Sequence, residues 1–490
     1  MARFVLTFIS ILSIFLTLSA CKIGGSSSSG GSTGGGGGDN NNDTPPNNDP
    51  ELVTVNYDLT FFYANNGSFS AWYVYDTLEQ QLLTLDDTLV RGGSEILDYY
   101  QNGRYLYLNV KDLANTYQVF KLDLHTHTME QLNWNASGAS TLRSPVKIGD
   151  YIYFGGDVGD GRGQELYKMN LNTEQVTLVY DIYSGASPSY ASNLILVGDS
   201  IYFTANDGTH GTELWKHDLN LGTTAMVADR NPTANGGGAG VGGFKLHDDG
   251  FIYGTFADNS DFVFHIYKFN PTNDTFTQLT THETSNSLYP IIDNKIFHRG
   301  IGASGTEPYF VDLTDNSITL LDDVYVGVGS SFPNFPFDEP IGDLVIYSAK
   351  PTGETSWYLH SYNLSNGTNT LITYSGDKMT TGVGVISNLF YMIGSTAAGG
   401  GELFSLNSSG TVTPLPEGLA GAASSIYKAF VTGNFLFVGF ETDTNVGKEP
   451  FIYNPSNNTF TGLGDLNSGA SDSQPQGALR INGSYQIQAE

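Results

Sequence analysis

Two hairpin patterns recur along the chain, and this repetition constrains the fold more than any other feature. The segment from Gly149 to Asp181 holds one copy of each hairpin, and a closely similar segment begins at Gly198, about 49 residues later. Each copy consists of short apolar strands separated by turn residues. A period of about 40–50 residues made of short strands indicates a β-propeller, in which each blade is a four-stranded antiparallel sheet.

The first hairpin places a turn dipeptide between two apolar strands. Most of these dipeptides contain Gly, Asn or Asp, which accept the positive φ that two-residue hairpin turns require. Ten copies align: Tyr57-Asp58, Asn102-Gly103, Gly149-Asp150, Gly198-Asp199, Asp249-Gly250, Asp293-Asn294, Gly342-Asp343, Ser387-Asn388, Gly433-Asn434 and Asn482-Gly483. Nine full units plus a terminal hairpin over residues 478–489 predict a single all-β propeller of about nine blades, with eight as the alternative. We expect this terminal hairpin, or one strand of it, to pair with residues 52–57 and close the ring.

The second hairpin begins with a six-residue strand that ends in Asp or Asn in every copy. An Asp or Asn side chain can accept a hydrogen bond from the backbone two residues on and so start a turn. The nine positions are Asp76, Asp123, Asn170, Asp218, Asn270, Asp312, Asn363, Asn407 and Asn454. The third residue of the strand is aromatic in eight of the nine copies, as at Tyr167 and Trp215, and His360 is the exception. We expect these rings to pack between neighbouring blades, which is a structural role.

One unit carries a more specific signature. Glu213-Leu214-Trp215-Lys216-His217-Asp218, preceded by Asn206-Asp207-Gly208-Thr209, resembles the ELWxxDGT-type repeats of bacterial secreted propeller proteins. Residues 149–230 carry the resemblance best. The Asp-Gly-Thr that follows the tryptophan strand in that family is replaced here, since Leu219-Asn220 comes after Asp218. The resemblance therefore implies a fold more than a function.

The first twenty residues have the pattern of a secretory signal peptide: a short basic start, then an apolar run from Phe4 to Leu18 that is short for a membrane span. Leu18-Ser19-Ala20-Cys21 resembles the lipobox of bacterial lipoproteins, and Cys21 is the one cysteine of the chain. In that family the cysteine receives a diacylglycerol on sulfur and a fatty acid such as palmitate on its new amine. The resemblance implies lipid attachment at Cys21. Lys22 after it favours the outer membrane, facing either the periplasm or the cell surface.

Three segments follow from these patterns: the signal peptide at 1–20, the lipidated cysteine and its linker at 21–50, and the propeller at 51–490. The linker is rich in Gly, Ser and Asn and has almost no apolar residue, so it cannot form a core. A flexible segment of this length has a root-mean-square span of roughly 30 Å. Its expected role is to hold the propeller away from the membrane.

The charge of the chain excludes one class of partner. Fifty acidic and 21 basic residues give a net charge of −29, so nothing would neutralise the phosphates of a nucleic acid. A single cysteine also excludes an internal disulfide and a cysteine-based metal site.

Several motifs resemble chemical sites, but their context favours structural roles. The acidic loops 157–161 and 206–208 could bind Ca²⁺, although ordinary turns explain them and no cofactor is expected. Residues 238–243 match GxGxxG without a βαβ context, which indicates an interblade loop. His125 and His127 alternate but fall in a hairpin turn without a third ligand. One recurring carboxylate could form a cation-binding ring, or could bond a neighbouring turn: Glu165, Glu213, Glu307, Glu402 and Glu449.

No nucleophile elbow or HExxH motif is present. The sequence therefore favours a non-enzymatic, membrane-tethered propeller that binds an envelope protein or a glycan. Two alternatives stay open: a hydrolase or lyase acting on polysaccharide through carboxylates in the propeller channel, and a passive structural protein of the cell surface.

Overall fold

The computed structural model describes residues 52–488, except 66–69, 85–89, 91–95, 136–137, 231, 233–239, 259–262, 288, 396–400, 416–425, 442–447 and 468–472. They belong to one compact unit, Leu52–Glu490. The predicted signal peptide, Cys21 and the predicted linker lie outside the described residues. The described part is all-β, and it contains no helix long and apolar enough to cross a membrane.

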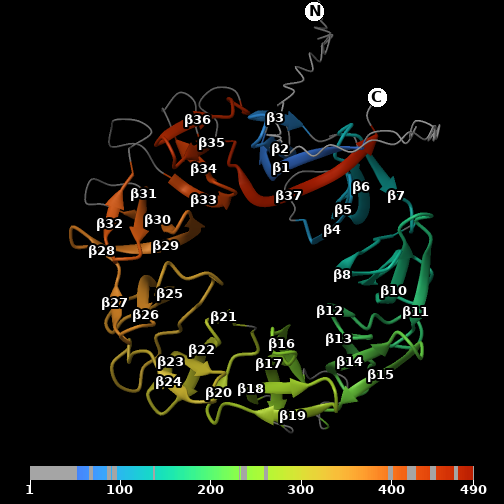
Figure 1. Ribbon diagram of the computed structural model, residues 1–490, viewed down its shortest axis with the longest axis horizontal. Coiled ribbons are helices and arrows are strands. Elements are labelled where there is room, and N and C mark those ends of the chain that lie inside the picture. Colours follow the sequence, from blue (N-terminus) through green and yellow to red (C-terminus); the bar gives the residue numbers. More distant parts are fainter. Residues whose placement is uncertain are drawn as a thin grey trace, which may run out of the picture. The chain divides into compact units, whose positions relative to one another are not determined.

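The strands form nine blades in chain order, each an antiparallel meander (Figure 1). Blades 1 to 3 contain β37 (Gln476–Gln488), β1 (Leu52–Asn65), β2 (Ser70–Asp76) and β3 (Gln81–Thr84); β4 (Asp98–Asn102), β5 (Tyr105–Lys111), β6 (Tyr117–Asp123) and β7 (Met129–Leu132); and β8 (Arg143–Ile148), β9 (Tyr151–Gly156), β10 (Glu165–Asn170) and β11 (Val176–Tyr180). Blades 4 to 6 contain β12 (Ser192–Val197), β13 (Ser200–Asn206), β14 (Thr212–Asp218) and β15 (Thr223–Ala228); β16 (Val241–Leu246), β17 (Ile252–Asp258), β18 (Val263–Asn270) and β19 (Thr275–Gln278); and β21 (Ile291–Ile292), β22 (Lys295–Gly302), β23 (Gly305–Asp312) and β24 (Ile318–Leu320). Blades 7 to 9 contain β25 (Leu344–Ala349), β26 (Tyr358–Asn363) and β27 (Asn369–Leu371); β28 (Thr373–Tyr374), β29 (Asp377–Ile386), β30 (Leu389–Ser395), β31 (Gly401–Asn407) and β32 (Val412–Pro414); and β33 (Ile426–Thr432), β34 (Phe435–Glu441), β35 (Lys448–Asn454) and β36 (Thr459–Gly462).

Four blades depart from the four-stranded pattern. The short strand β20 (Glu283–Thr284) pairs with both β18 and β22, so blades 5 and 6 share one continuous sheet. Blade 7 has three named strands, and an isolated bridge between Ile341 and Leu344 stands in place of its first strand. Blade 8 gains the extra strand β28. The nine blades predicted from the repeat are confirmed among the described residues.

The strands are separated by tight turns that the sequence dictates. The hairpin β8–β9 turns at Gly149, whose φ of +58° is accessible to glycine without strain. The hairpin β21–β22 uses Asp293 and Asn294, both with positive φ, as a type I′ turn requires.

Chain closure differs from the prediction in one respect. As expected, the C-terminal segment pairs with the N-terminal strand, and Leu59 lies opposite Ile481. However, Tyr57-Asp58 and Asn482-Gly483 are not turns: they face each other in the middle of the β1–β37 ladder. The prediction of a terminal hairpin over residues 478–489 is therefore wrong, because β37 is one continuous strand. Since each chain end finds a partner in the other, neither has to fold back on itself.

Each pair of neighbouring blades buries an apolar cluster between its faces. Tyr167 of blade 3 is 1% exposed and packs in a cluster with Val119 of blade 2, and Trp215 of blade 4 packs with Leu166 of blade 3. Blade 9 packs on blade 1 in the same way, through Phe437 and Phe62, whose ring centroids lie 4.5 Å apart. This last contact closes the ring.

The second hairpin turns the same way in all nine blades. The side-chain oxygen of the Asp or Asn that ends the third strand accepts a hydrogen bond from the backbone N–H two residues on. The donors lie 2.9–3.1 Å from Asp76, Asp123, Asn170, Asp218, Asn270, Asp312, Asn363, Asn407 and Asn454. These residues define the repeat by fixing its outer turn.

Candidate binding face

The meander gives the blades two unlike ends. The turn between the first and second strands and the turn between the third and fourth lie at one end, which we call the turn face. The connection between the second and third strands, and the connection to the next blade, lie at the opposite end, which we call the loop face. The loop-face connections are the longer ones, such as residues 181–191 and 321–343. Loops held on a rigid scaffold are the usual carriers of binding.

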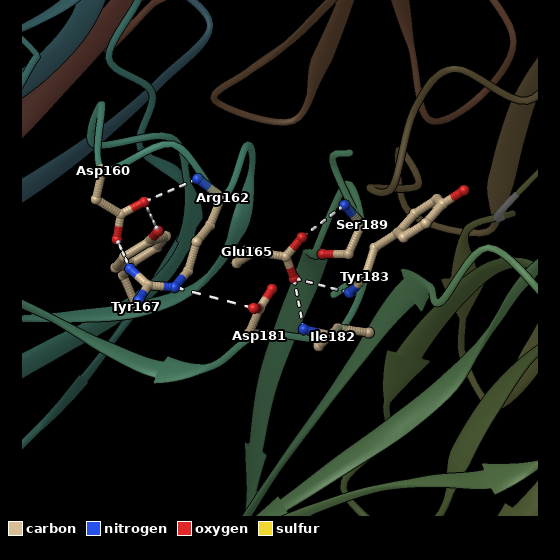
Figure 2. A network of polar contacts seen from close by, with 8 residues as sticks. All are labelled: Asp160, Arg162, Glu165, Tyr167, Asp181, Ile182, Tyr183 and Ser189. Atoms are coloured by element: carbon tan, nitrogen blue, oxygen red, sulfur yellow. Dashed lines mark hydrogen bonds and ion pairs between the residues drawn. The ribbon is translucent and has the colours of Figure 1, made fainter. Parts of the chain in front are cut away.

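A buried glutamate fixes these loops. Glu165, at the start of β10, accepts hydrogen bonds at Oε2 from the N–H of Ile182 (2.7 Å) and of Tyr183 (3.3 Å), and at Oε1 from the N–H of Ser189 (3.0 Å) (Figure 2). The hydroxyl of Ser189 also donates to the carbonyl of Gln164, at 2.9 Å. We call this arrangement the glutamate clamp.

The clamp repeats with constant spacing. The N–H groups of the residues 17 and 24 positions after the glutamate also bind Glu307, through Val324 (3.0 Å) and Ser331 (3.2 Å). They bind Glu449 through Leu466 (2.9 Å) and Ser473 (3.2 Å). Glu213 accepts a hydrogen bond from the N–H of Arg230, also 17 positions later, at 3.1 Å. The fifth glutamate, Glu402, is half-buried. Four of the five carboxylates that could have formed a cation ring, those of Glu165, Glu213, Glu307 and Glu449, thus bond neighbouring loops.

Burial sets the electrostatics of the clamp. Desolvation raises the pKa of Glu165 to about 7, although hydrogen bonds from Ser189, Ile182 and Tyr183 favour the charged form. Desolvation also raises the pKa of Glu307 and of Glu449. Each of these carboxyl groups is buried and directs its oxygens at main-chain N–H donors rather than at a ligand. These glutamates therefore position loops.

The residue after the clamp serine adopts an unusual backbone conformation. Tyr190, Phe332 and Gln474 each follow the serine and have φ of +55°, +46° and +47°. A bulky residue in the left-handed region is strained and persists only where its surroundings hold it there. All three side chains are exposed, so the loop face displays a side chain at this position.

At blade 7 this display is elaborated into an aromatic patch, which we define as Phe332, Trp357 and Lys350. The indole N–H of Trp357 donates to the carbonyl of Phe332 at 3.2 Å. The ammonium of Lys350 lies 5.4 Å from the ring centroid of Phe332 and 5.8 Å from that of Trp357. Phe332 is 43% and Trp357 47% exposed. Two large rings and a cation therefore share one solvent-facing site.

The acidic loops satisfy their own turns. Asp157 accepts the N–H of Gly159 at 2.8 Å, and Asp160 binds both the Tyr167 hydroxyl (3.0 Å) and Arg162 (2.7 Å) (Figure 2). In the second loop, Asp207 binds the imidazole of His210 at 2.7 Å. Across the described residues, no group of three or more His, Cys, Asp or Glu side chains could hold a metal ion.

The other two motifs also have structural roles. His125 and His127 occupy the outer turn of blade 2, where both are exposed and His127 has a φ of +56°. Of residues 238–243, the first two lie outside the described residues. Gly240 donates its N–H to the carbonyl of Thr212 and lies so close to Glu213 that a Cβ would clash with that carboxylate. The prediction of an interblade loop over 238–243 is wrong for residues 241–243, which form the start of β16 because they pair with β17.

The junction of blades 5 and 6 holds an imidazole pair that the sequence did not single out. His282 and His298 lie with their Nε2 atoms 2.8 Å apart, and the rings stack with an angle of 7° between their planes. Burial lowers the pKa of His298 to about 3, and burial also lowers the pKa of His282. Both rings are therefore neutral at physiological pH, and the pair joins β22 to the segment that precedes β20.

A cleft opens on the turn face near blades 5 to 7, with a volume of about 410 Å³. Its walls include Asp248, Asp293 and Asp338, together with His247. Lys245 also lines the cleft, and its ammonium lies 3.3 Å from Asp338. This cleft gathers several carboxylates in one place.

Sequence reasoning identified the recurring glutamates and missed their partners. The signal was present as a spacing, since Glu165, Glu307 and Glu449 are each followed 24 residues later by a serine. The aromatic patch left no such signal. Phe332, Lys350 and Trp357 lie on two different connections, and only the fold brings them together.

No protein-family model matches this sequence. No curated protein matches it either. Among solved structures, dipeptidyl peptidase 4 of Porphyromonas gingivalis is 8% identical with a TM-score of 0.46, covering 79% of this chain and 60% of that chain. This chain thus spans less than two thirds of that protein.

Two further structures are similar to nearly their full length. The β-propeller domain of the Trilobed protease from Pyrococcus furiosus is 12% identical with a TM-score of 0.34, covering 76% of this chain and 96% of that one. Oligogalacturonate lyase from Vibrio parahaemolyticus is 11% identical with a TM-score of 0.34, covering 69% and 95%. At these identities the likenesses assign no function to this chain.

Proposed function

We propose that this protein is a lipid-anchored, non-enzymatic propeller of the cell envelope whose loop face binds a protein or glycan partner. The observation that carries the proposal is the display of side chains on strained backbone at the same position of three loops, those that follow blades 3, 6 and 9. Strain of this kind is concentrated at functional sites. The buried glutamate clamps support the display, because they hold the loops in one conformation before any partner arrives.

The anchoring half of the proposal rests on the sequence. Cys21 follows an apolar signal segment in a lipobox-like setting, and the linker to residue 50 gives the propeller reach. The outer membrane is the favoured location. Mass spectrometry of the mature N-terminus should find Cys21 as the first residue, carrying diacylglycerol and a fatty acyl chain. A mature chain that begins elsewhere, or an unmodified cysteine, would remove the anchor from the account.

A face-specific capture experiment tests the binding half. Envelope extracts would be passed over the mature protein, over a loop-face variant (Phe332→Ala with Tyr190→Ala) and over a turn-face variant (Asp293→Asn with Asp338→Asn). We expect a discrete partner that is retained by the wild type and the turn-face variant and lost by the loop-face variant. Retention of nothing above background would favour the passive structural alternative.

The cleft on the turn face supports a second candidate, hydrolysis or cleavage of polysaccharide. Glycoside hydrolysis needs two carboxyl groups roughly 5–10 Å apart, and Asp248, Asp293 and Asp338 share this cleft. Release of new reducing or unsaturated sugar ends from polysaccharides, abolished by Asp293→Asn, would establish it. The absence of any release by the wild type would leave the binding function as the remaining one.

A further inference from the structure

The aromatic patch is a built site. Phe332 is held by its left-handed backbone and by the clamp on Ser331, and Trp357 is held by its bond to the Phe332 carbonyl. The loops that carry them are tied at another point, where the N–H of Val326 donates to the hydroxyl of Thr352 at 2.7 Å. Rings fixed in this way lose little conformational entropy when a ligand binds.

The charge of the patch is unusual for this chain. Lys350 lies between the two rings in a protein that carries 50 acidic and 21 basic residues. The acidic side chain on its own loop, Glu354, bonds Lys378 and the Tyr358 hydroxyl. On the connection from blade 6 to blade 7, Asp322 accepts a hydrogen bond from the side-chain amide of Asn369, and Asp323 accepts one from the N–H of Gly327. The Lys350 ammonium is therefore available to an anion from outside.

The surroundings of the patch are rich in hydroxyl groups. Thr352, Thr355 and Ser356 are exposed on the loop that ends at Trp357. Each hydroxyl can both donate and accept a hydrogen bond. A flat apolar surface, a single cation and a rim of hydroxyls together match a ring with a C–H face, a carboxylate and several hydroxyls of its own.

We propose that the Phe332–Trp357–Lys350 patch binds an acidic sugar residue of a polysaccharide, such as a uronate. The C–H face of the pyranose ring packs on the two aromatic rings, and the carboxylate pairs with the Lys350 ammonium. The inference rests on the proposed binding function of the loop face and specifies its ligand. A protein interface of ordinary size buries about 800 Å² on each partner, whereas this patch fits one or two sugar residues.

The negative charge of the chain does not prevent this binding. At physiological ionic strength the Debye length is about 8 Å, so distant carboxylates are screened and the charges next to the ligand decide. Lys350 is itself partly exposed, so added salt screens its attraction for an anion. We therefore expect the affinity to fall moderately as salt is added.

Titration of the purified mature protein with defined oligosaccharides tests the proposal. The panel would contain oligogalacturonate and alginate oligomers, with neutral galactose and mannose oligomers of the same length, and binding would be measured by calorimetry. Trp72 and Trp215 are buried, and Trp134 is half-buried and stacks on Phe154, so Trp357 is the exposed tryptophan and serves as a fluorescent reporter in the wild type. We expect acidic oligomers to bind at least tenfold more tightly than neutral ones and to shift this emission.

Variants separate the contributions. Phe332→Ala and Trp357→Ala should each weaken binding at least tenfold, and Lys350→Met should remove the preference for acidic over neutral oligomers. Phe332→Gly keeps the backbone conformation without strain and should lose binding equally, which excludes a folding defect. Asn170→Ala is the control: Asn170 lies in the outer turn of blade 3, on the opposite face, and its replacement should leave binding within twofold of the wild type.

Failure of the proposal is distinguishable from failure of the binding function. If no acidic oligomer binds, or if Phe332→Ala and Lys350→Met leave binding unchanged, the acidic-sugar proposal is overturned. If the capture experiment nevertheless retains an envelope partner through the loop face, the proposed function stands with another ligand. Binding of a peptide at the patch, without binding of any acidic sugar, would also contradict the inference.

Discussion

The junctions after blades 3 and 6 share a scaffold and differ in what they display. Both have a buried glutamate that binds the N–H groups 17 and 24 residues later, Glu165 in one and Glu307 in the other. Both place an exposed aromatic residue in the left-handed region directly afterwards, Tyr190 or Phe332. Only Phe332 has an indole and a lysine beside it in the described structure. The shared part is therefore structural, and specificity resides in the part that differs.

Removing the clamp should give the largest effect and should be similar at both junctions. Glu165→Ala removes the acceptor of the Ile182 and Tyr183 N–H groups, and Glu307→Ala removes that of Val324. The N–H groups of Ser189 and Ser331 lose one of two acceptors, since they also donate to the carbonyls of Gln164 and Thr306. Each buried N–H group left without an acceptor costs about 1–3 kcal/mol, and we expect each variant to lose about 2–4 kcal/mol of stability in chemical denaturation. Glu79→Ala is the control, since Glu79 is exposed in the outer turn of blade 1. A loss confined to one junction would show that the scaffold is not shared.

The pH dependence of the clamp should be the next largest effect. The pKa of Glu165 is raised to about 7 in the folded protein, above its value in the unfolded chain, because burial disfavours the carboxylate. Its contribution to stability is therefore complete below about pH 4.5 and falls as pH rises through 7. The stability of the wild type relative to Glu165→Gln should fall by up to about 3 kcal/mol between pH 4.5 and 8, measured by denaturation at each pH. The opposite slope would mean that the hydrogen bonds outweigh desolvation.

Relief of backbone strain should give a smaller effect of opposite sign. Glycine tolerates positive φ without the clash that Cβ makes with the backbone. We expect Tyr190→Gly to be more stable than Tyr190→Ala by about 1 kcal/mol, and the same order at position 332, in thermal denaturation. Elsewhere in a strand or turn with negative φ, alanine should be the more stable of the two. Equal stabilities at positions 190 and 332 would indicate that the loops relax to another conformation.

The smallest effects belong to the turn face. Asn170→Ala removes two exposed turn bonds, from the N–H groups of Asn172 and Thr173, and should cost about 0.5–1 kcal/mol. Asp312→Ala should cost slightly more, because Asp312 also pairs with Lys295 at 3.3 Å and its pKa is lowered, chiefly by the hydroxyl of Thr314. Neither variant should alter ligand binding on the loop face. A change in binding by either one would show that the two faces are coupled.

The predictability of this molecule follows from the range of its contacts. Turns depend on neighbouring residues, so the dipeptide at Gly149 and the outer turn at Asn170 were readable directly. Closure of the ring could also be predicted without side-chain detail, because an open ring would leave one edge of β1 without a partner strand. The sequence could not show that Tyr57-Asp58 and Asn482-Gly483 are not turns, because similar dipeptides at the equivalent position form turns in the eight other copies. What differs is a partner more than 400 residues away.

The candidate site was less accessible for the same reason. The recurrence of Glu165 and Glu307 was visible, and a bond to a neighbouring turn was the favoured interpretation. Which N–H groups these carboxylates bind depends on the path of the connection that leads from the outer strand of one blade to the next blade. The grouping of Phe332 with Lys350 and Trp357 depends on two such connections at once, and no periodicity encodes it.

The central claim is that buried glutamates hold the loop face in the conformation that displays the patch. Hydrogen exchange of backbone amides in Glu307→Ala tests it most directly, with Glu165→Ala as the matched variant. The account predicts that exchange of Val324, Ser331 and their neighbours accelerates at least tenfold in Glu307→Ala while Ile182 and Ser189 keep their protection, and the reverse in Glu165→Ala. Unchanged protection at 324–332 after removal of Glu307 would contradict it.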